Sequence, residues 1–136
     1  MIDVLSSQHY DVLTEDDIVT VRRRVNALAV EQRFSPFAAA AITTATSELA
    51  RNIWHHANKG KVLVEAVRDG DRNGLQLTFI DEGPGIAEVE RVLRGGFSTA
   101  NSMGMGLSGS KRLVDEFDLK TIVGSGTTVR IVKWKR

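Results

Sequence analysis

The sequence contains no cysteine in its 136 residues. This absence excludes disulfide bonds, zinc–thiolate sites and thiol chemistry. No leading apolar run resembles a signal peptide or a membrane-spanning segment, so we expect a cytoplasmic protein with no membrane partner. Internal repeats and low-complexity linkers are also absent, and the length fits one domain of roughly 100–200 residues. We therefore expect a single domain over residues 1–136.

The chain also lacks an excess of charge of either sign. Its 18 Lys and Arg residues nearly balance its 17 Asp and Glu residues, which leaves a formal net charge of +1. A protein without a strong overall field is not drawn to nucleic acid, so we expect no nucleic-acid partner. Hydrophobic residues make up 42% and charged residues 26%, a balance typical of folded globular proteins. Function must therefore be sought in local motifs.

Two common nucleotide-binding patterns and a metal cluster are missing. No lysine follows glycines in the Walker arrangement G-x-x-x-x-G-K-[ST]. Gly104-Met-Gly-Leu-Ser-Gly109 matches G-x-G-x-x-G, but a dinucleotide-binding fold needs a strand directly before it, and residues 97–103 make a poor strand. His55 and His56 are adjacent but lack a third metal ligand, so packing or polar contacts are favoured over zinc.

The spacing of polar and apolar residues predicts alternating helices and strands. Thr14 and Asp17 have the spacing of a capping box, so a helix should follow to about Gln32. Ser35-Pro36 suits the start of a second helix that runs to about Ala57. Further helices are expected around Glu88–Arg94 and from about Ser108 to Phe117. Strands are expected at His9–Leu13, Val62–Val67, Leu75–Asp81, Leu119–Val123 and Thr127–Trp134.

A carboxylate and an amide lie one turn apart on the second predicted helix. Glu48 and Asn52 border its apolar stripe, and residues at i and i+4 stand roughly 5–6 Å apart between Cβ atoms. That distance allows both to face one metal–phosphate centre. Considered alone, the two residues favour the interpretation of solvated side chains on an amphipathic helix.

Asp81 ends a predicted strand whose other inward residues are large and apolar. Leu75, Leu77, Phe79 and Asp81 share parity, so a period of two places the carboxylate on their face of the sheet. A buried carboxylate costs several kcal/mol unless a donor meets it, and we therefore expect a partner for it. The alternative is that Asp81 simply caps the turn after its strand.

Glycine is concentrated in one part of the chain. Nine of the twelve glycines fall between Gly83 and Gly126, a stretch that contains three ordered glycine turns. The small and polar residues of the segment 95–106 favour a functional loop or lid over a buried connection. The turns are Asp81-Glu-Gly-Pro-Gly-Ile86, Gly104-Met-Gly-Leu-Ser-Gly109 and Gly124-Ser-Gly-Thr-Thr128.

Together with Glu48-Leu-Ala-Arg-Asn-Ile-Trp-His-His-Ala57, these turns resemble the N box and the three glycine boxes of the GHKL (Bergerat-fold) ATPase and kinase superfamily. Within it, the chain is most similar to the anti-sigma-factor-type serine/threonine kinases that act as stressosome switches. The resemblance runs from about Thr14 to the end. It implies an α+β fold, a two-layer sandwich with helices on one face of a mixed, largely antiparallel sheet.

The resemblance also implies ATP and Mg²⁺ as cofactors. Asn52 would hold Mg²⁺, Glu48 would act as general base, and Asp81 would accept a hydrogen bond from the adenine amine. Residues from about Ala87 to Met103 would form an ATP lid. The remaining nucleotide-binding residues implied by the glycine boxes are Gly83, Gly85, Ile86, Gly104, Met105, Gly106, Leu107, Gly109, Thr127 and Thr128.

A chain of this length has no room for the separate helical domain that carries the phosphoacceptor of a sensor histidine kinase. The resemblance instead implies transfer of phosphate to Ser or Thr of a STAS-domain protein that serves as substrate and scaffold. Once released, the kinase would activate a PP2C-type phosphatase. The alternatives are an anti-sigma factor that sequesters a sigma subunit, and a nucleotide-gated binding module without significant catalysis.

Overall fold

The computed structural model describes residues 1–87 and 103–135. The helix predicted around Glu88–Arg94 lies outside them, as does most of the predicted lid. No helix in these two segments is long and apolar enough to cross a membrane. The elements are β1 (Asp3–Val12), α1 (Glu15–Glu31), α2 (Pro36–Ala57), β2 (Gly60–Asp69), β3 (Arg72–Asp81), α4 (Met103–Leu113), β4 (Glu116–Ile122) and β5 (Gly126–Trp134).

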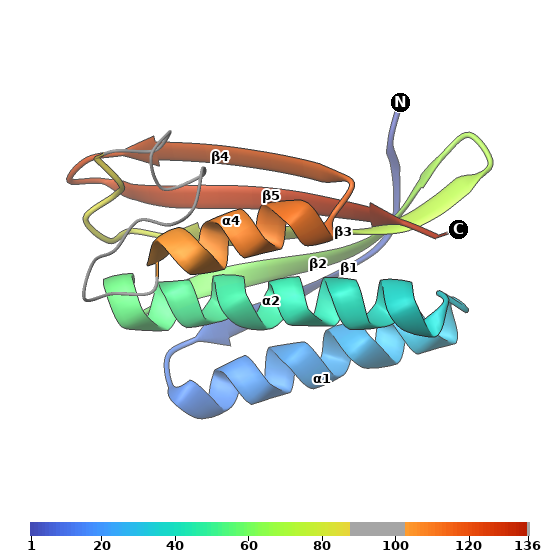
Figure 1. The fold of residues 1–136 in the computed structure, drawn as a ribbon, viewed down its shortest axis with the longest axis horizontal. Helices are drawn as coiled ribbons and strands as arrows, with labels where there is room; N and C mark the ends of the chain where they lie inside the picture. Colours follow the sequence, from blue (N-terminus) through green and yellow to red (C-terminus); the bar gives the residue numbers. More distant parts are fainter. Residues whose placement is uncertain (88–102, 136) are drawn as a thin grey trace.

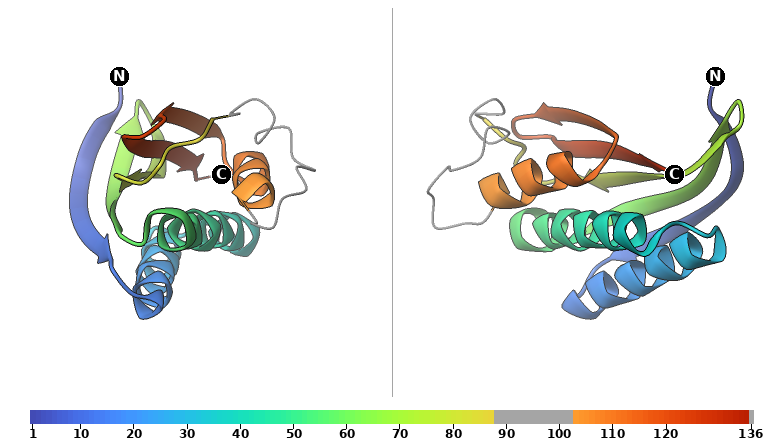
Figure 2. Two further views of the ribbon diagram at one scale, coloured as in Figure 1. Left: turned by 90° about the vertical axis from the view of Figure 1, so that its left-hand side faces the viewer. Right: turned by 45° about the vertical axis from the view of Figure 1, so that its right-hand side comes forward.

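The five strands form one sheet in the order β1-β2-β3-β5-β4. The helices lie on one side of it, with α2 and α4 side by side and α1 packed below α2 (Figures 1 and 2). This α+β arrangement confirms the predicted two-layer fold. The expectation of a mixed sheet was wrong, because every strand pairing among the described residues is antiparallel.

Helix α1 and helix α2 begin where their capping residues lie. The Thr14 hydroxyl accepts from the Asp17 amide, and the Asp17 carboxylate accepts from the Thr14 amide at 3.0 Å, which completes the capping box. The Ser35 hydroxyl accepts from the Ala38 amide at 3.1 Å. At the other end of α2, Asn58 adopts a left-handed φ of 66° and stops the helix. The two helical predictions are confirmed.

Strands β2, β3 and β4 differ from their predicted bounds by two or three residues at an end, and β1 and α4 differ more. Strand β1 starts at Asp3 rather than His9, because it is an edge strand whose side chains are mostly exposed and show no apolar alternation. Helix α4 starts at Met103 rather than near Ser108, so the second glycine box lies inside a helix rather than in a turn. It ends at Leu113, because Phe117 already belongs to β4 and pairs with Ile131 of β5.

The core lies between α2 and the inner face of the sheet. Ala38, Ala45 and Ala50 are buried on α2, and their small side chains let the helix approach the strands closely. Leu75 and Leu77 of β3 have no exposed surface, which confirms the predicted inward parity of this strand. The sheet therefore carries Asp81 on its inner face, at the end of β3.

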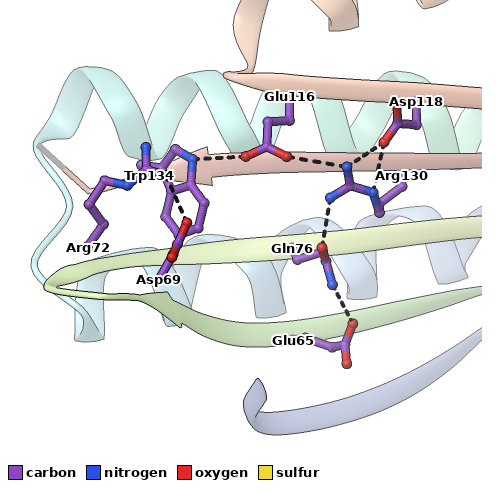
Figure 3. Close-up of polar contacts among 8 residues, drawn as sticks. All are labelled: Glu65, Asp69, Arg72, Gln76, Glu116, Asp118, Arg130 and Trp134. Atoms are coloured by element: carbon purple, nitrogen blue, oxygen red, sulfur yellow. Dashed lines mark hydrogen bonds and ion pairs between the residues drawn. The ribbon is translucent and has the colours of Figure 1, made fainter. Parts of the chain in front are cut away.

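The outer face of the sheet bears a polar network instead of helices (Figure 3). Arg130 of β5 pairs with Asp118 and Glu116 of β4, and its Nη1 donates to Gln76 of β3 at 2.8 Å. At one end of this face, the Trp134 indole donates to Glu116. These contacts give the outer face of β4 and β5 a network of ion pairs and hydrogen bonds.

Candidate functional site

A cavity opens on the inner side of the sheet, where the ends of β3 and β5 meet α2 and α4. Its walls are largely apolar, and a few polar groups converge in it, a combination typical of small-molecule sites. The lining residues are Leu49, Asn52, Ile53, His56, Phe79, Asp81, Pro84, Gly85, Ile86, Leu107, Thr127 and Val129. The structure thus brings together residues from the N box and from all three predicted glycine boxes.

Asp81 enters this cavity from the end of β3 and is half-buried. One carboxylate oxygen, Oδ1, accepts from the Gly83 amide at 2.9 Å. In the described part of the chain no hydrogen bond reaches Oδ2. The carboxylate therefore stabilises the turn after its strand, and the expectation of a further donor for it stays a prediction.

Two polar atoms on successive turns of α2 are buried without a partner. They are Asn52 Nδ2 and His56 Nε2, and neither has a hydrogen bond to any residue in 1–87 or 103–135. Burial lowers the pKa of His56, the nearby His55 lowers it further, and Asp81 opposes this effect. His56 is therefore held in its neutral form at physiological pH. A buried unpaired polar group costs about 1–3 kcal/mol, which a ligand in the cavity would recover.

His56 was missed as a candidate from sequence. Its signal is nevertheless present, because Glu48, Asn52 and His56 recur every four residues and so follow one side of α2. The prediction that His56 serves packing or polar contacts is compatible with its cavity position. No group of three His, Asp or Glu side chains in the described residues is arranged to hold a metal ion.

Glu48 lies outside the cavity lining. Its carboxylate pairs with Arg51 of the same helix, with 3.0 Å between Oε1 and Nη1. Both side chains are partly exposed, at 37% for Glu48 and 45% for Arg51. The structure therefore places the predicted base one helical turn from Asn52, but outside the cavity lining and with its carboxylate paired with Arg51.

Two glycines allow the ends of the sheet to close on the turn after β3. Gly85 has φ of 77°, and a Cβ atom there would lie 2.5 Å from the Ile122 carbonyl oxygen. Gly126 has φ of 137°, and a Cβ atom there would overlap the Asp81 carbonyl. Both positions therefore require glycine, since only glycine adopts such φ values without a steric penalty.

Thr127 and Thr128 face opposite sides of the sheet. Thr127 lines the cavity and pairs in register with Asp81 of β3. Thr128 pairs with Ile80 and Lys120, which lie on the outer face. Of these two predicted nucleotide contacts, the structure brings only Thr127 to the site.

The second glycine box reaches the site through helix α4. Gly104, Met105 and Gly106 belong to its first turn, Leu107 is buried in the cavity wall, and Gly109 lies further along the helix. The amides of a first helical turn have no partner within their own helix and favour an anion. The expectation of a glycine turn here is corrected to a helix N-terminus, which provides the same amide groups.

Comparison with known proteins identifies the family of the chain. Residues 12–133 match the family described as the histidine kinase-like ATPase domain. The serine/threonine-protein kinase RsbT of Bacillus subtilis is 45% identical over 125 residues, which cover 92% of this chain and 94% of RsbT. An anti-sigma F factor of Caldanaerobacter subterraneus is 33% identical over 97 residues, or 68% of each chain.

Solved structures share the fold at lower identity. The RsbU and RsbW domains of a Mycobacterium tuberculosis protein match with a TM-score of 0.66 and 21% identity over 96% of this chain, which spans 33% of that structure. The SiaB–SiaC complex of Pseudomonas aeruginosa matches with a TM-score of 0.61 and 15% identity, over 96% and 90% of the two chains. The chain belongs to the histidine kinase-like ATPase family and, as predicted, is a serine/threonine-protein kinase within it.

Proposed function

We propose that this kinase transfers the γ-phosphoryl group of ATP to a Ser or Thr of a STAS-domain protein, and that on release from this partner it activates a PP2C-type phosphatase. The observation that supports ATP binding is the inward carboxylate of Asp81 in a largely apolar cavity. The likeness to RsbT and to anti-sigma factors supports the signalling part. We also propose that the protein acts in the cytoplasm as a single domain.

The base of ATP suits the cavity beside Asp81. The free carboxylate oxygen Oδ2 would accept a hydrogen bond from the adenine amine, and Thr127 offers a second polar group next to it in register. The buried side chains of Ile86, Leu107 and Val129 provide apolar surface for the ring. Such a site recognises a flat ring through burial and fixes its orientation through a few hydrogen bonds.

The phosphates would extend from the base toward α2 and α4. The first-turn amides of α4, from Gly104 to Gly106, are suited to an anion. Asn52 offers an amide oxygen for Mg²⁺, which binds one or two protein ligands and otherwise substrate phosphates and water. This ligand mode fits a site where no cluster of acidic side chains is found among the described residues. Bound Mg²⁺ would neutralise charge on the phosphates during transfer.

Glu48 would accept the proton of the attacking hydroxyl. Its carboxylate first has to leave Arg51, with which it pairs in the structure. An exposed ion pair of this kind is worth only about 0–1 kcal/mol, so releasing it costs little. A substrate hydroxyl that approaches the rim of the site next to α2 would then find the base one turn from the metal ligand Asn52.

The substrate assignment is tested by following the phosphate. The protein is incubated with γ-labelled ATP, Mg²⁺ and purified candidate STAS-domain proteins, and the label is located by mass spectrometry. We expect label on a Ser or Thr of one STAS-domain protein, and far less of it when Glu48→Gln replaces the parent. ATP bound without label on any added protein would contradict the STAS assignment and favour the nucleotide-gated binding module.

The similarity to anti-sigma F factors supports a second candidate function, sequestration of a sigma subunit. This function requires a stable complex with a sigma factor, which a kinase that only switches between STAS protein and phosphatase does not form. Size-exclusion chromatography of the protein with candidate sigma factors, in the presence of ATP, distinguishes the two. Co-elution with a sigma factor would favour the anti-sigma function.

A further inference from the structure

We propose that Thr121 is a positioning residue for recognition of the nucleotide base. Its hydroxyl fixes the direction in which the Thr127 hydroxyl proton points, and thereby makes the cavity selective for a purine with an amine at position 6. The inference rests on the proposed ATP site and adds a residue to it from outside the cavity lining and outside all four sequence motifs.

Three polar side chains form a row across the inner face of the sheet. Asp81 of β3 is the register partner of Thr127 of β5, and Thr127 is in turn the partner of Thr121 of β4. Side chains of residues that pair directly lie on the same face of an antiparallel sheet. The row therefore leads from the cavity carboxylate to the edge strand, and the two threonine hydroxyls are 2.9 Å apart.

The Thr121 hydroxyl joins three segments of the chain. It accepts a hydrogen bond from the Ile86 amide at 2.9 Å, which ties it to the turn after β3. It also lies 3.1 Å from the Gly126 carbonyl oxygen, at the start of β5. Nearby, the Gly124 amide donates to the Pro84 carbonyl at 2.8 Å and holds the same two turns together. The hydroxyl thus lies between an amide that can only donate a hydrogen bond and a carbonyl that can only accept one.

These fixed roles determine the proton positions. A hydroxyl has one proton and two lone pairs, and the Ile86 amide occupies one lone pair of Thr121. The Gly126 carbonyl can only accept, so the Thr121 proton points to it when all groups are satisfied. The remaining lone pair of Thr121 then accepts the proton of Thr127. Thr127 is left with lone pairs only, and it presents an acceptor to the cavity.

Two acceptors side by side discriminate between bases. Asp81 Oδ2 and the Thr127 hydroxyl both favour a donor such as the exocyclic amine of adenine. A base with a carbonyl oxygen at the same position would meet two lone-pair groups and leave them unpaired, which is costly in a buried site. Without the Thr121 hydroxyl, Thr127 regains a proton that it can turn toward such a carbonyl.

The test compares ATP with inosine triphosphate, which carries a carbonyl oxygen in place of the amine. Dissociation constants are measured by calorimetry for the parent, Thr121→Val and Thr121→Ser, with Thr78→Val on the outer face of the same sheet as control. We expect Thr121→Val to reduce the preference for ATP over inosine triphosphate by on the order of tenfold, the effect of about one hydrogen bond. Thr121→Ser and Thr78→Val should keep the preference of the parent for ATP over inosine triphosphate.

A purely structural role for Thr121 predicts a different result. Thr121→Val would then weaken both nucleotides equally, and an unchanged ratio would overturn the inference. If Thr121→Val does not fold, Thr127→Val removes the proposed acceptor directly, and retention of the full preference in that variant would overturn it as well. A parent chain that binds neither nucleotide would instead refute the proposed function, and this inference with it.

Discussion

The carboxylate of Glu48 is paired with the guanidinium of Arg51, 3.0 Å away on the next turn of α2. A sequence motif shows that a carboxylate is present at this position. Only the structure shows that the carboxylate is already paired with another side chain. In the structure the predicted base lies one helical turn from Asn52, but its carboxylate is paired with Arg51. Each partner can be removed without the other, and this makes the role of Glu48 testable.

Glu48→Gln should abolish most phosphoryl transfer while ATP still binds. Loss of a general base typically lowers the rate by about 10²–10⁴-fold, and we expect a decrease in this range in single-turnover transfer to the protein substrate. Arg51→Gln is the matched control, because it breaks the same ion pair and leaves the carboxylate free. It should retain activity, and both variants should keep the free energy of unfolding within about 1 kcal/mol of the parent. An equal loss of activity in Arg51→Gln would assign the function to the ion pair instead.

Asn52→Ala should remove the metal dependence of nucleotide binding. If the amide oxygen holds Mg²⁺, the affinity for ATP in the presence of Mg²⁺ should fall to the value measured with EDTA. The apo protein should not lose stability, since its buried Nδ2 has no partner in residues 1–87 and 103–135. Calorimetry with and without Mg²⁺, together with thermal unfolding, checks both points. A persistent gain in affinity from Mg²⁺ in Asn52→Ala would place the metal ligand elsewhere.

The stability of the apo protein should fall in mildly acidic solution because of His56. Burial lowers the pKa of this side chain from 6.5, so the unfolded chain binds a proton at a pH where the folded chain does not. The free energy of unfolding should therefore decrease as the pH falls below 6.5 toward the folded-state pKa. Chemical denaturation at a series of pH values should show a weaker decrease for His56→Gln, which keeps His9 and His55 unchanged. Identical curves would contradict the buried neutral state of His56.

Gly126→Ala should destabilise the fold strongly. The residue has φ of 137°, and a Cβ atom there would overlap the carbonyl of Asp81, so strain and steric overlap add. We expect a loss of about 2–4 kcal/mol in the free energy of unfolding and loss of ATP binding. Gly70→Ala is the control, because Gly70 also has a positive φ, 63°, but nothing lies within 4 Å of its Cβ position. Its loss should be limited to about 1–2 kcal/mol. Equal losses of stability in the two variants would show that the overlap with the Asp81 carbonyl adds nothing to the cost of the positive φ.

Much of the fold was predictable because its signals are local. The caps of α1 and α2 depend on residues three or four positions apart, such as Thr14 and Asp17, and the parity of β3 can be counted along one strand. The start of β1 was not predictable, since its exposed side chains carry no pattern and its backbone pairs with the distant strand β2. The glycines of α4 indicated a turn, yet a helix forms there and packs its residue Leu107 into the cavity wall.

In the candidate site, too, residues with a local sequence signal were predictable, and residues whose role depends on strand pairing were not. Asn52 and Asp81 were identified because each has a distinctive place on its own element, and the structure brings them into one cavity. Thr121 has no such signal, because its role depends on the register of β4 with β5 and on the turn after β3. Thr127 and Thr128 could not be separated without knowing which face of the sheet each occupies.

The central claim is that the inward carboxylate of Asp81 recognises the base of ATP. It is tested most directly by the dissociation constant for ATP, measured by calorimetry on Asp81→Asn. The control is Asp118→Asn, which removes a carboxylate that pairs with Arg130 on the outer face. We predict that Asp81→Asn weakens ATP binding at least tenfold, since a hydrogen bond to a charged group is worth about 1.5–3 kcal/mol, while Asp118→Asn binds like the parent. Unchanged ATP binding by Asp81→Asn would contradict the account.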